Sequence, residues 1–314
     1  MEKLDKFPPY YGPEWDEKIK DSSNPNFWKY GVANLVFLDY VRDRKLILDV
    51  GCGTGGSTFF LAEHGKAELI VGVDVVKSMI HVAKTNAIKK ELSHKTCFVI
   101  CDGRYLPFKV SCFDALVSRG DAFCFLTPLK DAVHEFKRVL SSSAVVVIEM
   151  DNRKDWKPDT IVSTGFQKRP DGRIAYLVEV FDSRRNHITT SHILDPKGKI
   201  VKDVSGDAEF AEKGHKTWEY SLCDIAKETI EIRLGVPSHW PTVKELRNLF
   251  RRSGYGDVEI KGDGLLMKLL LNGEKAITGA MKRQPPLFLK MEHKLIHFID
   301  PDKSPTIIVK AVKR

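Results

Sequence analysis

The sequence predicts an α/β protein built on a parallel sheet with helices on both faces, interrupted after the fifth strand by a β-rich insertion. Short apolar runs alternate with helical patterns from residue 25 to residue 150. A glycine-rich turn follows the first apolar run. After residue 150 the alternation gives way to adjacent strand patterns separated by turn signals. We therefore expect a sheet domain from residues 1–150 and 239–314, and an insertion at 151–238.

The first half of the chain contains five expected strands separated by helices. A helical pattern covers residues 25–45. Gly65 stops the helix after the glycine turn, and Pro128 lies in the first turn of another helix. The strands are expected at 46–50, 68–74, 96–102, 112–118 and 143–150, and the helices between them at 57–65, 75–92 and 128–140.

The second half begins with β-rich patterns that do not alternate with helices. They cover residues 173–181, 187–195 and 199–204, so we expect antiparallel strands. A helix follows at 242–255, with a starting signal at Pro241 and Thr242 and a stop at Gly254. Strands at 256–262 and 306–313 complete the pattern.

The composition excludes several classes of protein. The 314 residues are 42% hydrophobic, with no apolar run near the roughly 18 residues of a membrane span. The first residues lack the apolar segment of a secretory signal. The six cysteines form no C-x-x-C pair, which indicates reduced cysteines in a cytoplasmic protein. We expect no metal site.

The positive charge is concentrated near the end of the chain. The formal net charge is +8, and residues 261–314 hold eleven Lys or Arg against five acids. A solvated surface is the simplest interpretation, and attraction to nucleic acid, acidic substrates or a membrane face is the alternative. No RNA-binding signature accompanies these residues.

The glycine turn "LILDVGCGTGGSTFF" fits two cofactor fingerprints. Gly51, Gly53 and Gly56 match a dinucleotide site, whereas Asp49 with Gly51, Gly53 and Gly55 matches an S-adenosylmethionine (AdoMet) site. Asp74 suits ribose hydroxyls in both. Asp49 favours AdoMet, because a carboxylate there would repel a pyrophosphate and attract the ammonium group of a methionine.

Two further motifs favour the same cofactor. "CDGRYLPF" places Asp102 at the end of the third strand, and "FDALVS" follows about ten residues later. Together with the terminal "TIIVKAVK", the pattern resembles the class I AdoMet-dependent methyltransferases. The resemblance implies a Rossmann-like sheet whose last strand is reversed.

Three segments narrow the resemblance to the glycine N-methyltransferase subfamily. "VSRGDAFCFL" looks like its segment after the fourth strand, and "EMDNRKDWKPDTIVSTG" looks like its segment after the fifth. "GRIAYLVEVF" with "HITTSHILDPKGKIV" is similar to its β-rich insertion. The resemblance covers residues 46–220.

The resemblance implies a cofactor site made of residues from the first four strands. Asp74 would hold the ribose, Val75 and Met79 would cover the adenine, and Asp102 would accept from its amino group. Lys29 is the nearest match for a family arginine that binds the AdoMet carboxylate. The implied cofactor-binding residues are Asp49, Gly51, Cys52, Gly53, Asp74, Val75, Met79, Asp102, Gly103 and Arg119.

The acceptor residues implied by the resemblance are Asp121, Arg153 and Tyr176. Asp121 replaces a substrate-contacting asparagine of the subfamily, Arg153 matches a carboxylate-binding arginine, and Tyr176 matches an aromatic hydroxyl. Because a carboxylate at 121 would repel a free amino acid's carboxylate, glycine is not the expected substrate. A solvated loop arginine and an outward strand tyrosine are the simpler interpretations of the other two.

We therefore predict N-methylation of a small-molecule amine. Three alternatives stay open: methylation of a protein or tRNA, methylation of a lipid or quinone hydroxyl, and AdoMet binding without catalysis. In the lipid alternative, "GLLMKLLL" and "PPLFLKMEHKLIHFI" would form an apolar cap on a membrane surface. Two helices packed at the substrate mouth are the simpler interpretation of those segments.

Overall fold

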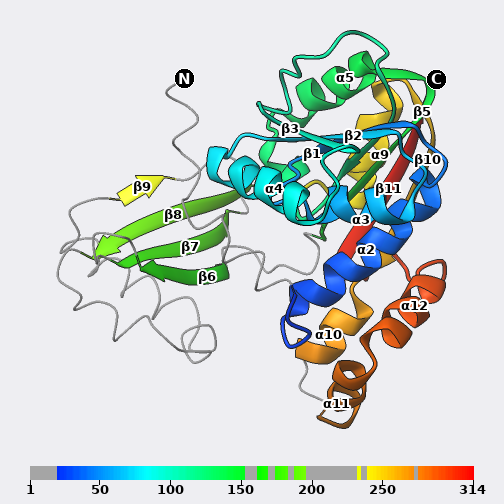
Figure 1. The fold of residues 1–314 in the computed structure, drawn as a ribbon. Helices are drawn as coiled ribbons and strands as arrows, with labels where there is room; N and C mark the ends of the chain where they lie inside the picture. Colours follow the sequence, from blue (N-terminus) through cyan, green and yellow to red (C-terminus); the bar gives the residue numbers. More distant parts are fainter. Residues whose placement is uncertain are drawn as a thin grey trace. The chain divides into compact units, whose positions relative to one another are not determined.

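The structure of this protein is a computed structural model (Figure 1). It describes residues 20–152, 161–168, 174–182, 187–195, 232–234, 239–271 and 275–314. The chain divides into two compact units. The described residues 20–152 and 241–314 belong to the first unit, and those from 161 to 240 belong to the second. Each unit is described by itself.

The first unit is built on a seven-stranded sheet with the order β10-β11-β5-β4-β1-β2-β3. Strands β1 to β5 pair in parallel, and β11 is antiparallel to both β5 and β10. The reversed last strand expected from the sequence is thereby confirmed. The strands are β1 (Leu46–Val50), β2 (Leu69–Asp74), β3 (Thr96–Ile100), β4 (Phe113–Ser118), β5 (Leu140–Asp151), β10 (Tyr255–Asp263) and β11 (Thr306–Lys313).

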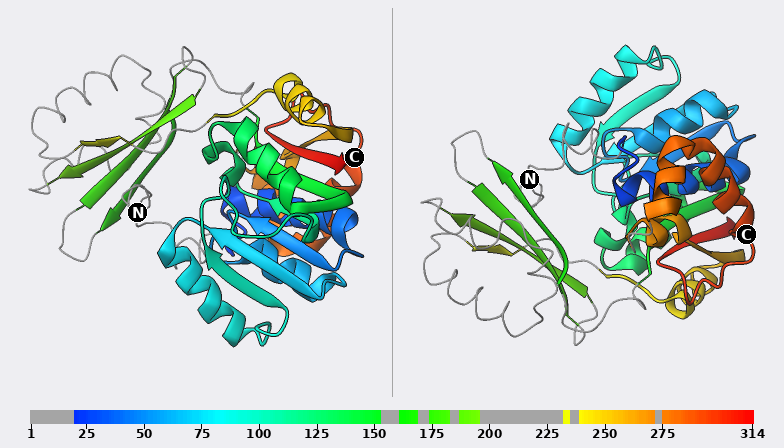
Figure 2. Two further views of the ribbon diagram at one scale, coloured as in Figure 1. Left: turned by 90° about the horizontal axis from the view of Figure 1, so that it is seen from above. Right: turned by 90° about the horizontal axis from the view of Figure 1, so that it is seen from below.

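Helices lie on both faces of this sheet (Figure 2). Helix α2 packs against α3 and β5, whereas α5 packs against α9 and β5. Helices α10 and α12 pack on α2, so they extend the α2 side of the sheet. The helices are α2 (Pro25–Val41), α3 (Gly56–His64), α4 (Lys77–Lys89), α5 (Leu129–Val139), α9 (Val243–Arg252), α10 (Leu265–Leu271), α11 (Lys275–Arg283) and α12 (Pro285–Leu295).

Local sequence signals fix several helix ends. Asn24 accepts a hydrogen bond from the Asn26 amide at the start of α2. Thr242 and Glu245 form a reciprocal capping box at the start of α9, which confirms the predicted starting signal. The helix expected over 25–45 ends earlier, at Val41. None of the helices that the structure describes is both long and apolar enough to cross a bilayer.

The main core lies between the sheet and helices α2, α3 and α4. Val36 and Phe37 of α2 contribute to it, together with Ile47, Val117 and Val147 of the central strands, all fully or nearly fully buried. Burying these side chains stabilises the fold by about 1.5–3 kcal/mol each. The short apolar runs of the sequence are therefore buried central strands, as predicted.

The fifth strand is longer than its sequence pattern indicates. β5 begins at Leu140, directly after α5, whereas the apolar run begins only at Ala144. The first part of β5 contains the polar residues Ser141 to Ser143, so it lacks the apolar pattern from which a buried strand is predicted. Ser143 has a positive φ of 61°, at the point where the register with β4 shifts.

The second unit contains an antiparallel sheet with the order β6-β7-β8-β9. The predicted strands near 173–181 and 187–195 are confirmed as β7 (Ile174–Asp182) and β8 (His187–Asp195). The sequence did not predict β6 (Ile161–Lys168) or β9 (Ile232–Leu234). The expected strand at 199–204 lies outside the described residues.

Candidate active site

The glycine turn after β1 has the left-handed backbone that its fingerprint predicts. Gly51, Gly53 and Gly55 have φ values of 73°, 54° and 94°. A Cβ atom at Gly51 would lie 2.1 Å from Cβ of Ala122, so only glycine fits there. A Cβ at Gly53 would meet Cε of Met79 at 4.0 Å, an ordinary contact. The turn therefore leaves room at Gly53, beside Met79, for a ligand to approach the backbone.

Asp74 and Asp49 hold this turn in place. The Asp74 carboxylate, at the end of β2, accepts the Gly53 amide at 2.9 Å and the Val76 amide at 2.8 Å. Burial raises its pKa to about 6. Asp49 is fully buried, and its Oδ2 accepts the hydroxyls of Ser57 and Thr58. Its Oδ1 has no hydrogen-bond partner within the part of the chain that the structure describes, so one acceptor remains at the tip of β1.

The remaining residues of the predicted cofactor site follow strands β3 and β4. Asp102, after β3, accepts from the Arg104 guanidinium at 2.5 Å. Arg119, after β4, donates to Asn34 at 2.7 Å and lies over the Tyr30 ring at 4.6 Å. A Cβ at Gly103 would lie 2.7 Å from a methyl group of Val50, so the backbone after β3 approaches the end of β1 closely at this glycine.

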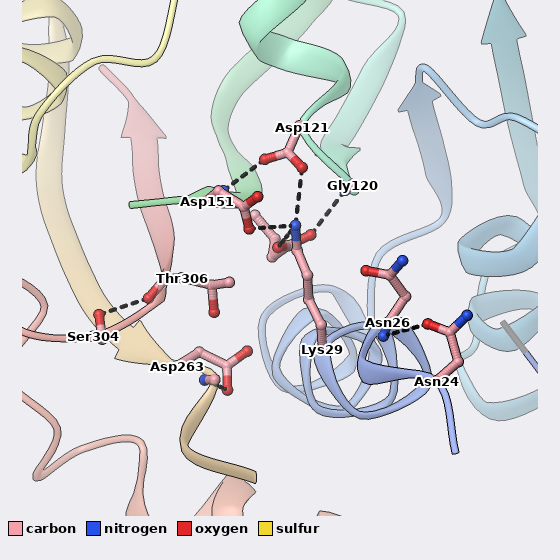
Figure 3. A network of polar contacts seen from close by, with 11 residues as sticks. Asn24, Asn26, Lys29, Gly120, Asp121, Asp151, Asp263, Ser304 and Thr306 are labelled. Atoms are coloured by element: carbon pink, nitrogen blue, oxygen red, sulfur yellow. Dashed lines mark hydrogen bonds and ion pairs between the residues drawn. The ribbon is translucent and has the colours of Figure 1, made fainter. Parts of the chain in front are cut away.

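A buried ion-pair cluster follows strands β4 and β5 (Figure 3). The Lys29 ammonium, from α2, lies 2.9 Å from Asp121, 2.7 Å from Asp151 and 3.3 Å from Glu149. Its side chain is 3% exposed, that of Glu149 is fully buried, and that of Asp151 is 33% exposed. Three carboxylates thus surround one ammonium, and Asp151 is the most accessible of the four.

Backbone contacts fix the carboxylates of this cluster. Asp121 has a φ of 65°, which is uncommon for a residue with a side chain. In this conformation its Oδ1 accepts the Asp151 amide at 2.6 Å while its Oδ2 accepts from Lys29. Glu149 accepts the Gly120 amide at 2.8 Å. The left-handed backbone at Gly120 and Asp121 therefore joins the ends of β4 and β5.

The cluster has perturbed protonation equilibria. Burial raises the pKa of Glu149 to about 7, although the Lys29 charge opposes the shift. Burial and the neighbouring Asp121 charge raise the pKa of Asp151 to about 6. Burial alone would lower the pKa of Lys29, but the three carboxylates raise it well above its usual value. Lys29 therefore stays a cation, whereas the raised pKa values of Glu149 and Asp151 allow these two acids to gain a proton near neutral pH.

Further buried oxygen atoms lie on the same side of the sheet. Thr306 is opposite Asp151 in the β11–β5 register, and Asp263 is opposite Thr306 in the β10–β11 register. Thr306 Oγ1 and Asp263 Oδ2 are buried without a hydrogen-bond partner among the described residues, whereas Glu149 Oε1 is paired with the Lys29 ammonium at 3.3 Å. Such atoms call for donors from water or from a ligand. The residues described here include no group of His, Cys, Asp and Glu arranged to hold a metal ion.

The sequence prediction missed most of this cluster. It selected Asp121 but not Glu149 or Asp151, and it assigned Lys29 to the AdoMet carboxylate, whereas its ammonium is held by three protein carboxylates. A usable signal was present: "IEMD" places two acids two positions apart at the end of a buried strand, hence on one face. Arg153 lies outside the described residues, and Tyr176 lies on β7, paired with Phe166 and Ile193.

The sheet order, the reversed β11 and the glycine turn define the class I AdoMet-dependent methyltransferase fold. Residues 47–143 match the family model described as a methyltransferase domain. The CcbJ methyltransferase from Streptomyces caelestis has a similar structure, with a TM-score of 0.56 at 13% identity over 90% of this chain and 95% of that one. That likeness concerns the fold alone.

Curated relatives match less than half of the chain. An uncharacterized protein of Methanocaldococcus jannaschii, MJ1252, is 29% identical over 130 residues, 41% of this chain and 46% of that protein. The 24-methylenesterol C-methyltransferase 2 of Arabidopsis thaliana is 33% identical over 114 residues, 36% of this chain and 30% of that protein. The matches thus span less than half the length of these relatives.

Residues 47–143 therefore match a methyltransferase domain, and they lie in a fold whose class uses AdoMet as methyl donor. The glycines of the turn, the Asp74 carboxylate and the open approach at Gly53 fit that cofactor. These comparisons do not single out the glycine N-methyltransferase subfamily that the motifs resemble. The acceptor must be inferred from the residues around Lys29.

Proposed function

We propose that this protein transfers a methyl group from AdoMet to the nitrogen of a small-molecule amine. The observation that carries this proposal is the excess of acid at the ends of β4 and β5. Asp121, Glu149 and Asp151 surround the single ammonium of Lys29, so the cluster is negative when all three acids are ionised. A negative site in a low-dielectric environment favours a cation and disfavours an anion.

The charge of the cluster suits the chemistry of N-methylation. AdoMet supplies a methyl group on a sulfonium, and the lone pair of an uncharged nitrogen displaces the sulfur from it. The positive charge then moves onto the nitrogen, where nearby carboxylates stabilise it. Holding the nitrogen about 3 Å from the methyl group, in line and away from water, supplies much of the acceleration.

The proposal assigns different roles to two acids. Asp121 orients the amine, because its carboxylate is fixed by Lys29 and by the Asp151 amide. Asp151 accepts the proton that an ammonium substrate must lose before it can attack, since its side chain is the most exposed of the cluster. A pKa raised to about 6 makes Asp151 a stronger base than an ordinary carboxylate while it stays ionised at neutral pH.

The resemblance to the glycine N-methyltransferase subfamily supports an amine as the acceptor, but the amine we propose is not glycine. A free amino acid would bring its own carboxylate beside Asp121 and Asp151, which is unfavourable. Arg153 and Tyr176 stay candidate acceptor residues from the sequence: an anionic group elsewhere on the substrate would suit Arg153, and the Tyr176 hydroxyl would assist orientation. The insertion at 151–238 would then form the substrate wall.

Product analysis tests the proposal. Purified protein is incubated with methyl-labelled AdoMet and separate pools of small amines, phenols, carboxylates, sterols and bulk tRNA. We expect the label in the amine pool, in a product retained by cation exchange with the label on nitrogen. Labelled product only in a hydroxyl, carbon or RNA fraction would overturn the assignment of the acceptor while leaving the cofactor assignment intact.

A further inference from the structure

The outward face of α12 carries large apolar side chains that the fold does not use. Leu287, Met291 and Leu295 recur every four residues on this helix and are 50%, 48% and 44% exposed. Phe298 lies in the turn that follows α12 and is 84% exposed. The chain's other exposed apolar side chains, such as Ile88 on α4, lie on different elements. We call these four residues the α12 ridge.

The ridge is not the face that attaches α12 to the protein. The opposite side of the helix packs on α2 and α10, where Phe288 and Leu289 join the buried Trp28 and Leu266. A Cβ at Gly31 of α2 would lie 2.7 Å from a methyl group of Leu289, so the two helices approach closely. The helix is therefore apolar on both sides, and the residues that the structure describes cover one of them.

The polar contacts of α12 also lie away from the ridge. Glu292 is buried and accepts the backbone amides of Gly264, Leu265 and Leu266 at the start of α10. His293 contacts Asp39 of α2 at 2.6 Å. These contacts hold the helix with its ridge outward, so the exposure of Met291 and Leu295 belongs to the folded arrangement.

The exposed charges along α12 itself are basic. Lys290 and Lys294 alternate with the ridge residues along α12, and Lys282 and Arg283 are exposed at the end of α11. Between residues 278 and 299 the single acid is Glu292, which is buried, whereas Asp300 and Asp302 are exposed beyond Phe298. An exposed apolar ridge bordered by lysines is complementary to an anionic lipid surface, where apolar side chains enter the acyl boundary and lysines reach the headgroups.

The same charges disfavour a second copy of the chain as the occupant. A two-fold dimer through this ridge would place Lys290 and Lys294 against the same residues of the other copy. The length of α12 decides how it would meet a bilayer. Its 11 residues span roughly 16 Å, about half of a hydrocarbon core, so it would lie in the plane of the surface.

We propose that the α12 ridge, with Lys290 and Lys294, docks this protein onto anionic lipid bilayers. This would bring the methyltransferase domain to amphipathic acceptors at the surface without changing the chemistry of its site. The docking does not depend on which atom is methylated.

Vesicle flotation tests the proposal. The full chain is mixed with vesicles of phosphatidylcholine and phosphatidylglycerol, and with vesicles of phosphatidylcholine alone. We expect binding to the anionic vesicles only, weakened by added salt. The double variant Met291→Ser with Phe298→Ser should bind at least about tenfold more weakly. Lys290→Glu with Lys294→Glu should also lose at least about tenfold.

Matched variants on α4 provide the control. Ile88→Ser changes a side chain that is 72% exposed, and Lys84→Glu with Lys89→Glu reverses two exposed lysines of that helix. These variants should bind vesicles like the unchanged protein, and calorimetric AdoMet binding should be preserved in every variant. Three results would each overturn the proposal: no binding to anionic vesicles, equal losses on α4 and α12, or a dimer that the ridge variants convert to a monomer.

Discussion

The two halves of the active-site edge use their acids in different ways. At the ends of β1, β2 and β3, each acid is held by local groups: Asp49 by two hydroxyls, Asp74 by two backbone amides and Asp102 by Arg104. At the ends of β4 and β5, three acids share the single ammonium of Lys29. The first half supports the backbone of the glycine turn, where we expect the cofactor. The second half concentrates negative charge.

This difference teaches how the site is divided. AdoMet needs shaped backbone and a few acceptors, which one strand–turn–helix segment supplies. The acceptor half needs a negative electrostatic potential at the substrate nitrogen. That potential depends on how many buried carboxylates converge there and on how far Lys29 compensates their charge. We therefore expect changes in the first half to alter AdoMet affinity, and changes in the second to alter stability or methyl transfer at unchanged AdoMet affinity.

The largest effect is expected from Lys29→Met. Removing the ammonium leaves Asp121, Glu149 and Asp151 buried without their shared cation, which should cost about 3–5 kcal/mol of unfolding free energy. Urea unfolding measures this loss. The matched control is Lys66→Met, which removes an exposed pair with Asp43 and should cost less than about 0.5 kcal/mol. Equal losses would contradict the compensating role of Lys29.

The loss in Lys29→Met should depend on pH. Burial raises the pKa of Glu149 to about 7 and that of Asp151 to about 6, above their values in an unfolded chain. A raised pKa means that the folded state binds the proton more tightly, so stability falls as the pH rises through that value. Without Lys29 both shifts grow, and the deficit should be larger near pH 8 than near pH 5.

The next effect is expected from Asp151→Asn. If Asp151 accepts the amine proton, this change should lower kcat/KM by about 10²–10³-fold. In the unchanged protein kcat/KM should fall as the pH drops below about 6, because Asp151 becomes protonated. The variant should lack that limb of the pH profile. A variant with the original profile and rate would show that another group takes the proton.

A smaller effect is expected in the cofactor half, from Asp74→Ala. The change removes an acceptor predicted to hold the ribose, and it also frees the amides of Gly53 and Val76. Calorimetry should show AdoMet affinity weakened by about 1–3 kcal/mol. Methyl transfer at saturating AdoMet should be largely preserved. Unchanged affinity, or tight NADH binding in place of AdoMet, would contradict the cofactor assignment.

The backbone of the cofactor half could be predicted because its signals are local. Gly51, Gly53, Gly55 and Asp74 lie within one strand–turn–helix–strand segment, and the glycine spacing predicts the tight turn that the structure shows. The roles of these residues toward AdoMet stay predictions. The β-branched pattern of β11 likewise predicts a strand, and its reversed direction was implied by the resemblance to class I methyltransferases. Periodicity and glycine chemistry act over a few residues, so they can be read without knowing the tertiary contacts.

The acceptor half could not be predicted in the same way, because it is assembled by tertiary packing. Lys29 lies 92 positions from Asp121 and 122 positions from Asp151, and only the packing of α2 on the sheet brings them together. Even the motif that singled out Asp121 did not indicate its partners. The pattern of α12 showed an apolar helix but not which side would stay exposed.

The division between the halves is tested most directly by Asp121→Asn. Asparagine tolerates the left-handed backbone at this position, so the fold should be retained. AdoMet affinity by calorimetry and kcat/KM for the amine are measured on the same preparation. The account predicts unchanged AdoMet affinity with kcat/KM lowered by about 10²-fold or more. Loss of AdoMet binding, with residual turnover in proportion to cofactor occupancy, would make Asp121 a cofactor residue and contradict the account.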